Sequence, residues 1–510
     1  MKKALAQNHG IHQNKKEDDG DVKAPSQAEA LAAATPAVSD PNLVTWTGAT
    51  DPEDPKNWPS GRKWLILVIV SSFTFMSPLS SSLVAPSLPA IGEDLHIPAG
   101  FQQTIAMSVF ILAYAIGPLF FGPLSEIYGR IVVLQITNAF YLVFNLCCGF
   151  AKTKAQLIVF RFLSGLGGSA PQAIGGGVVA DLFTPEQRGR ALSIYSLMPL
   201  FGPALGPIVS AFITEYTSWR WALYATSIAD AIIQCVALVF LRETYAPVLL
   251  ARKRVKLTKS SGNESLHTAF DDLDQALTKK IQFALSRPFR LLGTQIILQV
   301  LALYLMFLVG LMYIFLASLP TLFSSPPPEG YGESVGVGGL NYISLALGSF
   351  LGAQITAPFQ DRIYAALKRR HSSAGCPEYR VPMMIPGVLL VPIGLFIYGW
   401  TAEYKAHWIA PNIGVALIAL WITIATLCIQ TYLVDTYTKY AASAMAAALV
   451  LRSLAGFGFP LFASSLYDRL GFGWGNSLLA LVSIVIGWPG PAMLWFYGEA
   501  LRRRSHFAAG

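Results

Sequence analysis

The chain reads Gly122-Pro123-Leu124-Ser125-Glu126-Ile127-Tyr128-Gly129-Arg130 between two long apolar segments, residues 103–121 and 131–150. Each segment is long enough to cross a bilayer as a helix at about 1.5 Å per residue. The glycines of the short stretch permit a tight reversal at a membrane surface. Glu126 closes the first segment and Arg130 opens the second, so we expect opposite charges to meet across the turn.

Ten further segments have the same apolar character and length. The twelve expected spans are residues 64–84, 103–121, 131–150, 157–180, 191–213 and 221–241, followed by 292–319, 338–359, 383–400, 409–433, 442–466 and 474–497. A charged stretch of about 50 residues separates the two sets of six. Six spans, a hydrophilic loop and six more spans are the two-fold layout that transporters use.

The composition agrees with a membrane protein. Of the 510 residues, 53% are hydrophobic and only 13% are charged, whereas a soluble domain carries roughly 25% charged residues. The net charge of +8 is explained by basic loops that face anionic lipid, so we expect no nucleic-acid partner. The five cysteines form no CxxC pair, and we expect no disulfide framework, metal or cofactor.

The apolar pattern divides the chain into five parts. Residues 1–63 are polar and predict a disordered cytoplasmic tail, and residues 498–510 form a basic cytoplasmic tail. Residues 64–241 and 292–497 are the two expected six-helix bundles, joined by a cytoplasmic central loop at 242–291. The fold class is therefore an all-α membrane protein with twelve transmembrane helices in two pseudo-symmetric bundles.

Lysine and arginine set the orientation. With the N-terminus inside, the outward loops hold five basic residues, whereas the central loop alone holds ten. Both termini are then cytoplasmic. The cell membrane is the expected location, with the vacuolar membrane as the alternative.

The turn at Glu126 allows two interpretations. The segment after the tenth span begins with the small residues Ala441-Ala442-Ser443-Ala444, and the exposed amides of a helix start carry partial positive charge. A carboxylate docked there would latch the two halves on the cytoplasmic side. The alternative is a plain surface turn with an ion pair of little worth.

The same turn resembles the loop signature of the major facilitator superfamily, with Glu126 where Asp is commoner. A degenerate second copy follows the eighth span, with Gly352 and Asp361-Arg362. The resemblance implies a cytoplasmic gate that consists of Gly122, Glu126, Gly129, Arg130, Asp361 and Arg362.

The fifth span contains Gly202-Pro203-Ala204-Leu205-Gly206-Pro207. Glycines four residues apart let another helix approach closely, and the prolines kink the span. The stretch resembles the motif of proton-coupled exporters in the superfamily, which sugar importers usually lack. Ordinary helix packing is the alternative.

Further stretches resemble the fungal twelve-span drug:proton antiporters of the superfamily, from Trp46 to the C-terminus. They are Asp51-Pro52, Asn57-Trp58-Pro59 and Lys63-Trp64 before the first span, Arg242-Glu243-Thr244-Tyr245 after the sixth, Pro377-Glu378-Tyr379-Arg380 before the ninth, and Arg452-Ser453 with Phe459-Pro460-Leu461-Phe462 in the eleventh. This family includes exporters of drugs, polyamines and toxins. The resemblance does not name the cargo.

Three ionisable residues lie inside expected spans, where such residues are costly and are functional candidates. Arg161 lies at the start of a polar stripe along the fourth span. The alternative interpretation is that its side chain extends to the outer membrane surface. Asp230 lies in the middle of the sixth span and suits reversible protonation, or it is a neutral structural residue. Arg452 lies near the middle of the eleventh span, with function and structure equally open. Asp181 and Asp435 lie at cytoplasmic edges.

Aromatic and amide residues in the second half could form an apolar, sparsely polar pocket, with lipid-facing or packing roles as the alternative for each. They are Gln295, Gln299, Tyr304, Tyr313, Asn341, Trp421 and Gln430.

These observations predict a secondary active transporter that functions as a monomer and exports small hydrophobic or amphipathic molecules in exchange for protons. No Walker loop and no HExxH or GxSxG pattern occurs in the sequence, so we expect neither direct ATP drive nor an enzyme. The alternatives are a proton-coupled importer or a polyamine or nutrient carrier on the same fold, and a membrane receptor that does not transport.

Overall fold

The computed structural model describes residues 40, 42–48, 50–270, 277–370, 375–437, 440–503 and 505. Residues Val44–Gly510 form one compact unit. Helices make up nearly all of the described regular structure, and the two short strands β1 (Leu43–Val44) and β2 (His267–Thr268) pair with each other. The all-α fold class is confirmed.

The helices follow the expected order. The first half comprises η1 (Pro55–Asn57), α2 (Ser60–Leu83), α3 (Leu88–Asp94), α4 (Phe101–Tyr128), α5 (Arg130–Gly149), α6 (Lys154–Gly168), α7 (Ala170–Leu182), α8 (Pro185–Tyr216) and α9 (Trp219–Phe240). The central segment contains α10 (Ala246–Ser261) and α11 (Leu277–Thr294). The second half comprises α12 (Ile296–Ser324), α13 (Val335–Leu340), α14 (Tyr342–Arg370), η3 (Pro377–Met383), α15 (Met384–Glu403), α16 (Ile409–Thr436), α17 (Ala441–Gly487) and α18 (Pro489–Arg503).

Within the described residues, ten helical segments are long and apolar enough to cross a membrane. The predicted fourth span is missing from these ten because it is broken into α6 and α7 at Ser169, where Pro171 follows and lacks an amide proton. The segment Ser443–Arg503 is counted once, although the chain reverses inside it at Gly471, whose φ is +69°. With these two corrections the helices make the twelve predicted crossings.

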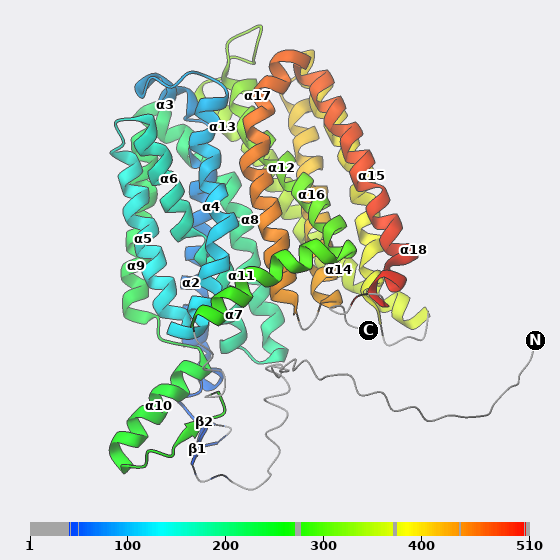
Figure 1. Ribbon diagram of the computed structural model, residues 1–510. Coiled ribbons are helices and arrows are strands. Elements are labelled where there is room, and N and C mark those ends of the chain that lie inside the picture. The colour runs from blue at the N-terminus through cyan, green and yellow to red at the C-terminus, as the bar shows by residue number, and fades with distance from the viewer. Residues whose placement is uncertain are drawn as a thin grey trace, which may run out of the picture. The chain divides into compact units, whose positions relative to one another are not determined.

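The two ends of the helical bundle differ (Figure 1). The short helices α3 and α13 lie at one end, which we call the α3 face, and α10 lies beyond the other end, which we call the α10 face. The first crossing helix, α2, begins at the α10 face, and α18 ends there. An even number of crossings places both ends of the bundle on the same face.

The sequence predicted a disordered tail up to residue 63, but its described part contains folded structure. Asp51 is buried, accepts hydrogen bonds from the Thr47 and Glu53 amides, both at 2.8 Å, and forms an ion pair with Lys253 of α10 at 3.2 Å. The Thr47 and Glu53 amides hold the pKa of Asp51 well below its usual range. This segment therefore packs against the central segment. Residues 1–39, 41 and 49 lie outside the described part.

The halves contact each other along several helix pairs. α4 packs along α17, and α8 packs against α13 and α14. At the α3 face, Glu215 of α8 accepts hydrogen bonds from Ser334 and from the backbone amide of Gly336 in α13. Near the α10 face, Leu285 of α11 packs against a small cluster of α4 and α17 side chains. The predicted central loop thus contains a helix that packs against both halves.

Candidate functional site

The reversal between α4 and α5 occurs at one residue. Helix α4 continues through Tyr128, and the chain turns at Gly129, whose φ of +105° favours glycine. Gly122 lies inside the helix, and a Cβ added there would meet no atom within 4 Å. Of the two signature glycines, the turn therefore requires only Gly129.

The predicted pairing of Glu126 with Arg130 is wrong in this structure. Arg130 Nε donates to Asp181 Oδ2 of α7 at 3.3 Å, and its Nη1 donates to Ser125 Oγ at 3.1 Å. Glu126 is exposed and has no hydrogen bond or ion pair with any described residue. The reason is that the Arg130 guanidinium is bound by Asp181 and Ser125 and is not directed toward Glu126. The carboxylate of Glu126 does not dock on α17 here.

Glu243 is a buried partner of this turn that the sequence analysis did not single out. Its carboxylate accepts from the amides of Arg130, at 2.9 Å, and Ile131, at 3.3 Å, which are the first two residues of α5. A carboxylate at a helix start is stabilised by the unpaired amides and the helix dipole. The sequence did contain a signal for this residue, because Glu243 lies within Arg242-Glu243-Thr244-Tyr245, one of the stretches that carry the family resemblance.

The second half repeats the arrangement, but through Arg380. Arg380 Nε donates to Asp435 Oδ2 at 3.0 Å, and its Nη1 donates to Asp361 Oδ1 at 3.1 Å. Arg380 precedes the ninth span and Asp435 ends the tenth, as Arg130 and Asp181 begin the third span and end the fourth. Arg362, the predicted basic residue of this copy, lies over the Phe359 ring instead, 5.8 Å from its centroid.

The fifth-span motif packs α8 directly on α2. A Cβ at Gly202 would lie 2.8 Å from the backbone nitrogen of Leu79, and one at Gly206 would overlap the backbone oxygen of Leu79. Pro203 and Pro207 are buried on the same helix. The motif therefore joins two helices backbone to backbone, as the glycine spacing predicted.

Arg161 is fully buried and is satisfied by backbone oxygens. Its guanidinium donates to the carbonyls of Ser80, at 2.8 Å, Ser81, at 3.1 Å, and Ala106, at 3.2 Å. Helix α2 ends at Leu83, so the carbonyls of Ser80 and Ser81 belong to its last turn and lack helical partners. Arg161 thus caps the negative end of α2 and does not extend to the surface.

Asp230 lies inside the first half, between α9 and α5. Its Oδ2 accepts from the Asn138 side chain at 3.0 Å, and Asn138 also donates to Gln234 at 2.9 Å. Its Oδ1 is buried and has no hydrogen-bond partner in the described part of the chain. A negative charge on this buried carboxylate oxygen would therefore not be stabilised by a hydrogen-bond donor of the described chain.

Arg452 differs from both. It is partly buried in α17, and no hydrogen bond or ion pair joins its guanidinium to a described residue. One turn further along α17, Gly456 lies against Tyr313 of α12 and Ile111 of α4. The charge therefore lies between helices of both halves without a counter-ion from the described chain.

A central polar cluster contains the phenols of Tyr313 and Tyr114. The Tyr313 hydroxyl lies 3.4 Å from Ser81 Oγ of α2, and the Ser81 carbonyl accepts a hydrogen bond from Arg161. Tyr114 hydrogen-bonds Ser77 of α2. The two arginines and Tyr313, a possible pocket residue, were predicted from the sequence, whereas Tyr114 and the α2 serines were missed because they carry no sequence signal of their own.

The other residues considered for a pocket are dispersed. Asn341 hydrogen-bonds Glu333 at 2.7 Å near the α3 face, and Gln299 donates to the Leu292 carbonyl at 2.8 Å near the opposite face. Of the residues considered, only Tyr313 is joined to the central polar cluster by an interaction that the structure describes.

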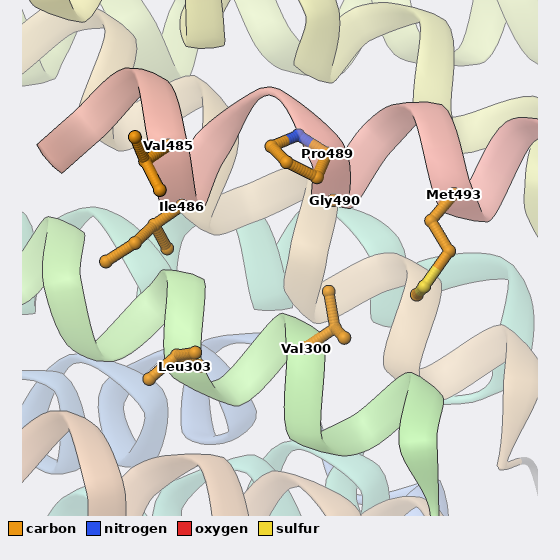
Figure 2. A pocket seen from close by; sticks show the side chains of 7 residues that line it. All are labelled: Val300, Leu303, Val485, Ile486, Pro489, Gly490 and Met493. Atoms are coloured by element: carbon orange, nitrogen blue, oxygen red, sulfur yellow. The ribbon is translucent and has the colours of Figure 1, made fainter. Parts of the chain in front are cut away.

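An apolar pocket of about 230 Å³ lies within the second half. Figure 2 shows it between α12, which contributes Val300 and Leu303, and the α17–α18 pair, which contributes the remaining lining residues. No lining side chain is polar, so the pocket offers nothing to orient a polar cargo group. It is a less suitable cargo site than the central polar cluster.

Comparison with known proteins gives the family. The family model described as "Major Facilitator Superfamily" matches residues 70–460. The chain is 46% identical over 507 residues to "Efflux pump vrtL" of Penicillium aethiopicum, covering 99% of each chain. It is 40% identical over 490 residues to "Efflux pump radE" of Floropilus chiversii, covering 95% of this chain and 90% of the relative.

A solved structure supports the same fold. The partially occluded, inward-open xylose transporter XylE of E. coli is 13% identical to this chain, with a TM-score of 0.62 over 86% of this chain and 98% of XylE. At this identity the likeness concerns the fold alone. The family match and the relatives show that this chain is a transporter of the Major Facilitator Superfamily.

Proposed function

We propose that this chain exports small molecules in exchange for protons by alternating access of its two halves. The observation that carries the proposal is the 46% identity to a protein named an efflux pump, because it extends over 99% of both chains. Similarity of this extent includes every span and both faces of the bundle.

The α2–α8 contact supports an exporter. Gly202 and Gly206 bring the backbones of the two helices together, so that they move as one rigid element. The motif resembles that of proton-coupled exporters, and here its glycines lie against Pro78, Leu79 and Ser82 of α2.

Asp230 is our candidate for the proton carrier. It is the one acidic residue well inside an expected span, and one of its oxygens has no partner among the described residues. Arg161 keeps its charge at any working pH, so it can act only by steering protonation elsewhere or by binding an anionic or polar cargo group.

The α10 face is proposed to be cytoplasmic, because the basic residues concentrate there. The two bundles at 64–241 and 292–497 would be the moving bodies, and Arg130 and Arg380 would stabilise the turns of the cytoplasmic gate. The cell membrane is the proposed location.

The test is efflux of a compound panel from cells that lack their own exporters. Collapse of the pH gradient by a protonophore should abolish extrusion, while ATP depletion at a clamped gradient should not. Extrusion that persists without the gradient and stops on ATP depletion would contradict the proposal. Gradient-dependent accumulation of a compound would instead favour an importer on the same fold.

A further inference from the structure

We propose that Arg452 binds an anionic group of the cargo, so that the exported molecules carry a carboxylate or an acidic phenol on an apolar, aromatic body. The inference deepens the proposed function, on which it rests, by naming the class of cargo.

The position of Arg452 suits cargo that passes between the halves. It lies eleven residues after the start of α17, about 16 Å along the helix, and therefore near the middle of the bilayer. One turn further, a Cβ at Gly456 would lie 2.9 Å from Ile111 of α4 and 3.1 Å from Tyr313 of α12. This side of α17 therefore faces helices of both halves.

The charge of Arg452 is not neutralised by the described chain. Charged side chains inside a membrane almost always pair with one another or with backbone carbonyls, and Arg161 does so with three carbonyls. Arg452 has no such partner among the described residues. Asp230 is held by Asn138 between α5 and α9.

The surroundings are aromatic as well as cationic. The Tyr313 ring lies against Gly456, one turn along α17 from Arg452, and two turns along α17 the Phe459 ring packs against Gly310 of α12. A second positive charge is close by, because Arg161 donates to the Ser81 carbonyl and the Ser81 hydroxyl lies 3.4 Å from the Tyr313 hydroxyl. A polycation such as a polyamine would be repelled here, whereas an aromatic acid gains both the charge and the ring contacts.

The experiment uses the full-length protein in lipid nanodiscs and two matched probe pairs: 2-naphthoate with 2-naphthamide, and benzoate with benzamide. Each pair differs in charge at nearly constant shape. The parent protein should bind 2-naphthoate at least tenfold more tightly than 2-naphthamide. Equal affinity for the two members, or absence of acid binding at millimolar concentration, would overturn the inference.

Substitutions at position 452 test whether Arg452 causes the preference for the acid over the amide. Arg452→Gln should remove the tenfold preference and leave amide binding unchanged, and Arg452→Lys should retain part of it because the charge remains. Arg369→Gln, at an exposed position on α14, is the matched control and should bind like the parent. A preference that survives in Arg452→Gln would also overturn the inference.

The result is independent of the proposed function. Binding in nanodiscs needs no gradient, so an acid preference together with gradient-independent efflux would contradict proton drive alone. Gradient-driven efflux with no acid preference would contradict the cargo class alone.

Discussion

Arg161 and Arg452 are both arginines inside membrane-spanning helices, yet their surroundings differ. Arg161 is fully buried and donates to three backbone carbonyls, whereas Arg452 is partly buried and has no hydrogen bond or ion pair within the described chain. An arginine in a membrane span can thus cap the C-terminal end of a helix or remain unpaired between helices. The role of a charged residue inside the membrane must therefore be inferred from its hydrogen-bond and ion-pair partners.

The largest effect is expected from Arg161→Gln. The substitution removes charge-assisted hydrogen bonds to the last turn of α2, each worth about 1.5–3 kcal/mol, so unfolding should become easier by about 3 kcal/mol or more. Thermal unfolding of the purified protein measures this loss, with Arg469→Gln at an exposed position as the control. A parental melting temperature combined with lost transport would mean that Arg161 acts in transport and not in architecture.

The next largest effect is expected from Asp230→Asn. Asp230 has fewer hydrogen-bond partners than Arg161 and more than Arg452. One of its oxygens is hydrogen-bonded and the other has no described partner. Asparagine preserves the shape and the acceptor for Asn138, so we expect a parental melting temperature, complete loss of gradient-driven efflux and intact exchange of cargo for cargo. Proteoliposomes with and without a pH gradient separate these activities. If gradient-driven efflux survives, Asp230 is a structural residue, and Asp181 and Asp435 become the candidates.

Gly206→Ala should lower the stability by a smaller amount, because it disturbs the contact between α8 and α2. The added Cβ overlaps the backbone oxygen of Leu79, and such overpacking costs typically about 1–3 kcal/mol. Gly189 lies on the same helix with nothing within 4 Å of its added Cβ. We therefore expect Gly189→Ala to be neutral or slightly stabilising. Equal melting temperatures for the two variants would contradict the close α2–α8 contact.

The smallest effect is expected from Glu126→Gln. The residue is exposed and has no partner in the described structure, so efflux should stay within about twofold of the parent, as for surface charges in general. Arg130→Ala removes a side chain bound to Asp181 and Ser125 and should reduce efflux much more. If Glu126→Gln is as harmful as Arg130→Ala, the carboxylate docks on α17 in another conformation and the latch interpretation is restored.

The fold could be predicted well from the sequence because the length and apolar character of each membrane-spanning helix are visible in one continuous stretch of residues. The details were also local in origin, since Pro171 follows the break in the fourth span and Gly471, with a positive φ, reverses the chain between the last two spans. The close approach at Gly202 and Gly206 was predictable for the same reason, because glycine spacing along one helix is visible without tertiary structure.

The site was less predictable because its contacts join distant parts of the chain. Glu243 binds amides more than a hundred residues away, and Arg161 binds carbonyls of another helix. Backbone groups have no sequence signature, so the partners of Arg161 could not be read from residue types. That no residue in the described part of the chain pairs with Arg452 could be seen only once the neighbouring helices were in place.

The central claim is that Arg452 faces a path open to cargo and water between the halves, and thiol accessibility tests it most directly. In a variant without the five native cysteines, Arg452→Cys should react with a water-soluble methanethiosulfonate, and 2-naphthamide, the uncharged probe, should slow the reaction. Ser453→Cys, at a buried position one residue further, should stay unreactive under the same conditions. An unreactive Arg452→Cys, or equal rates for the two variants, would contradict the account.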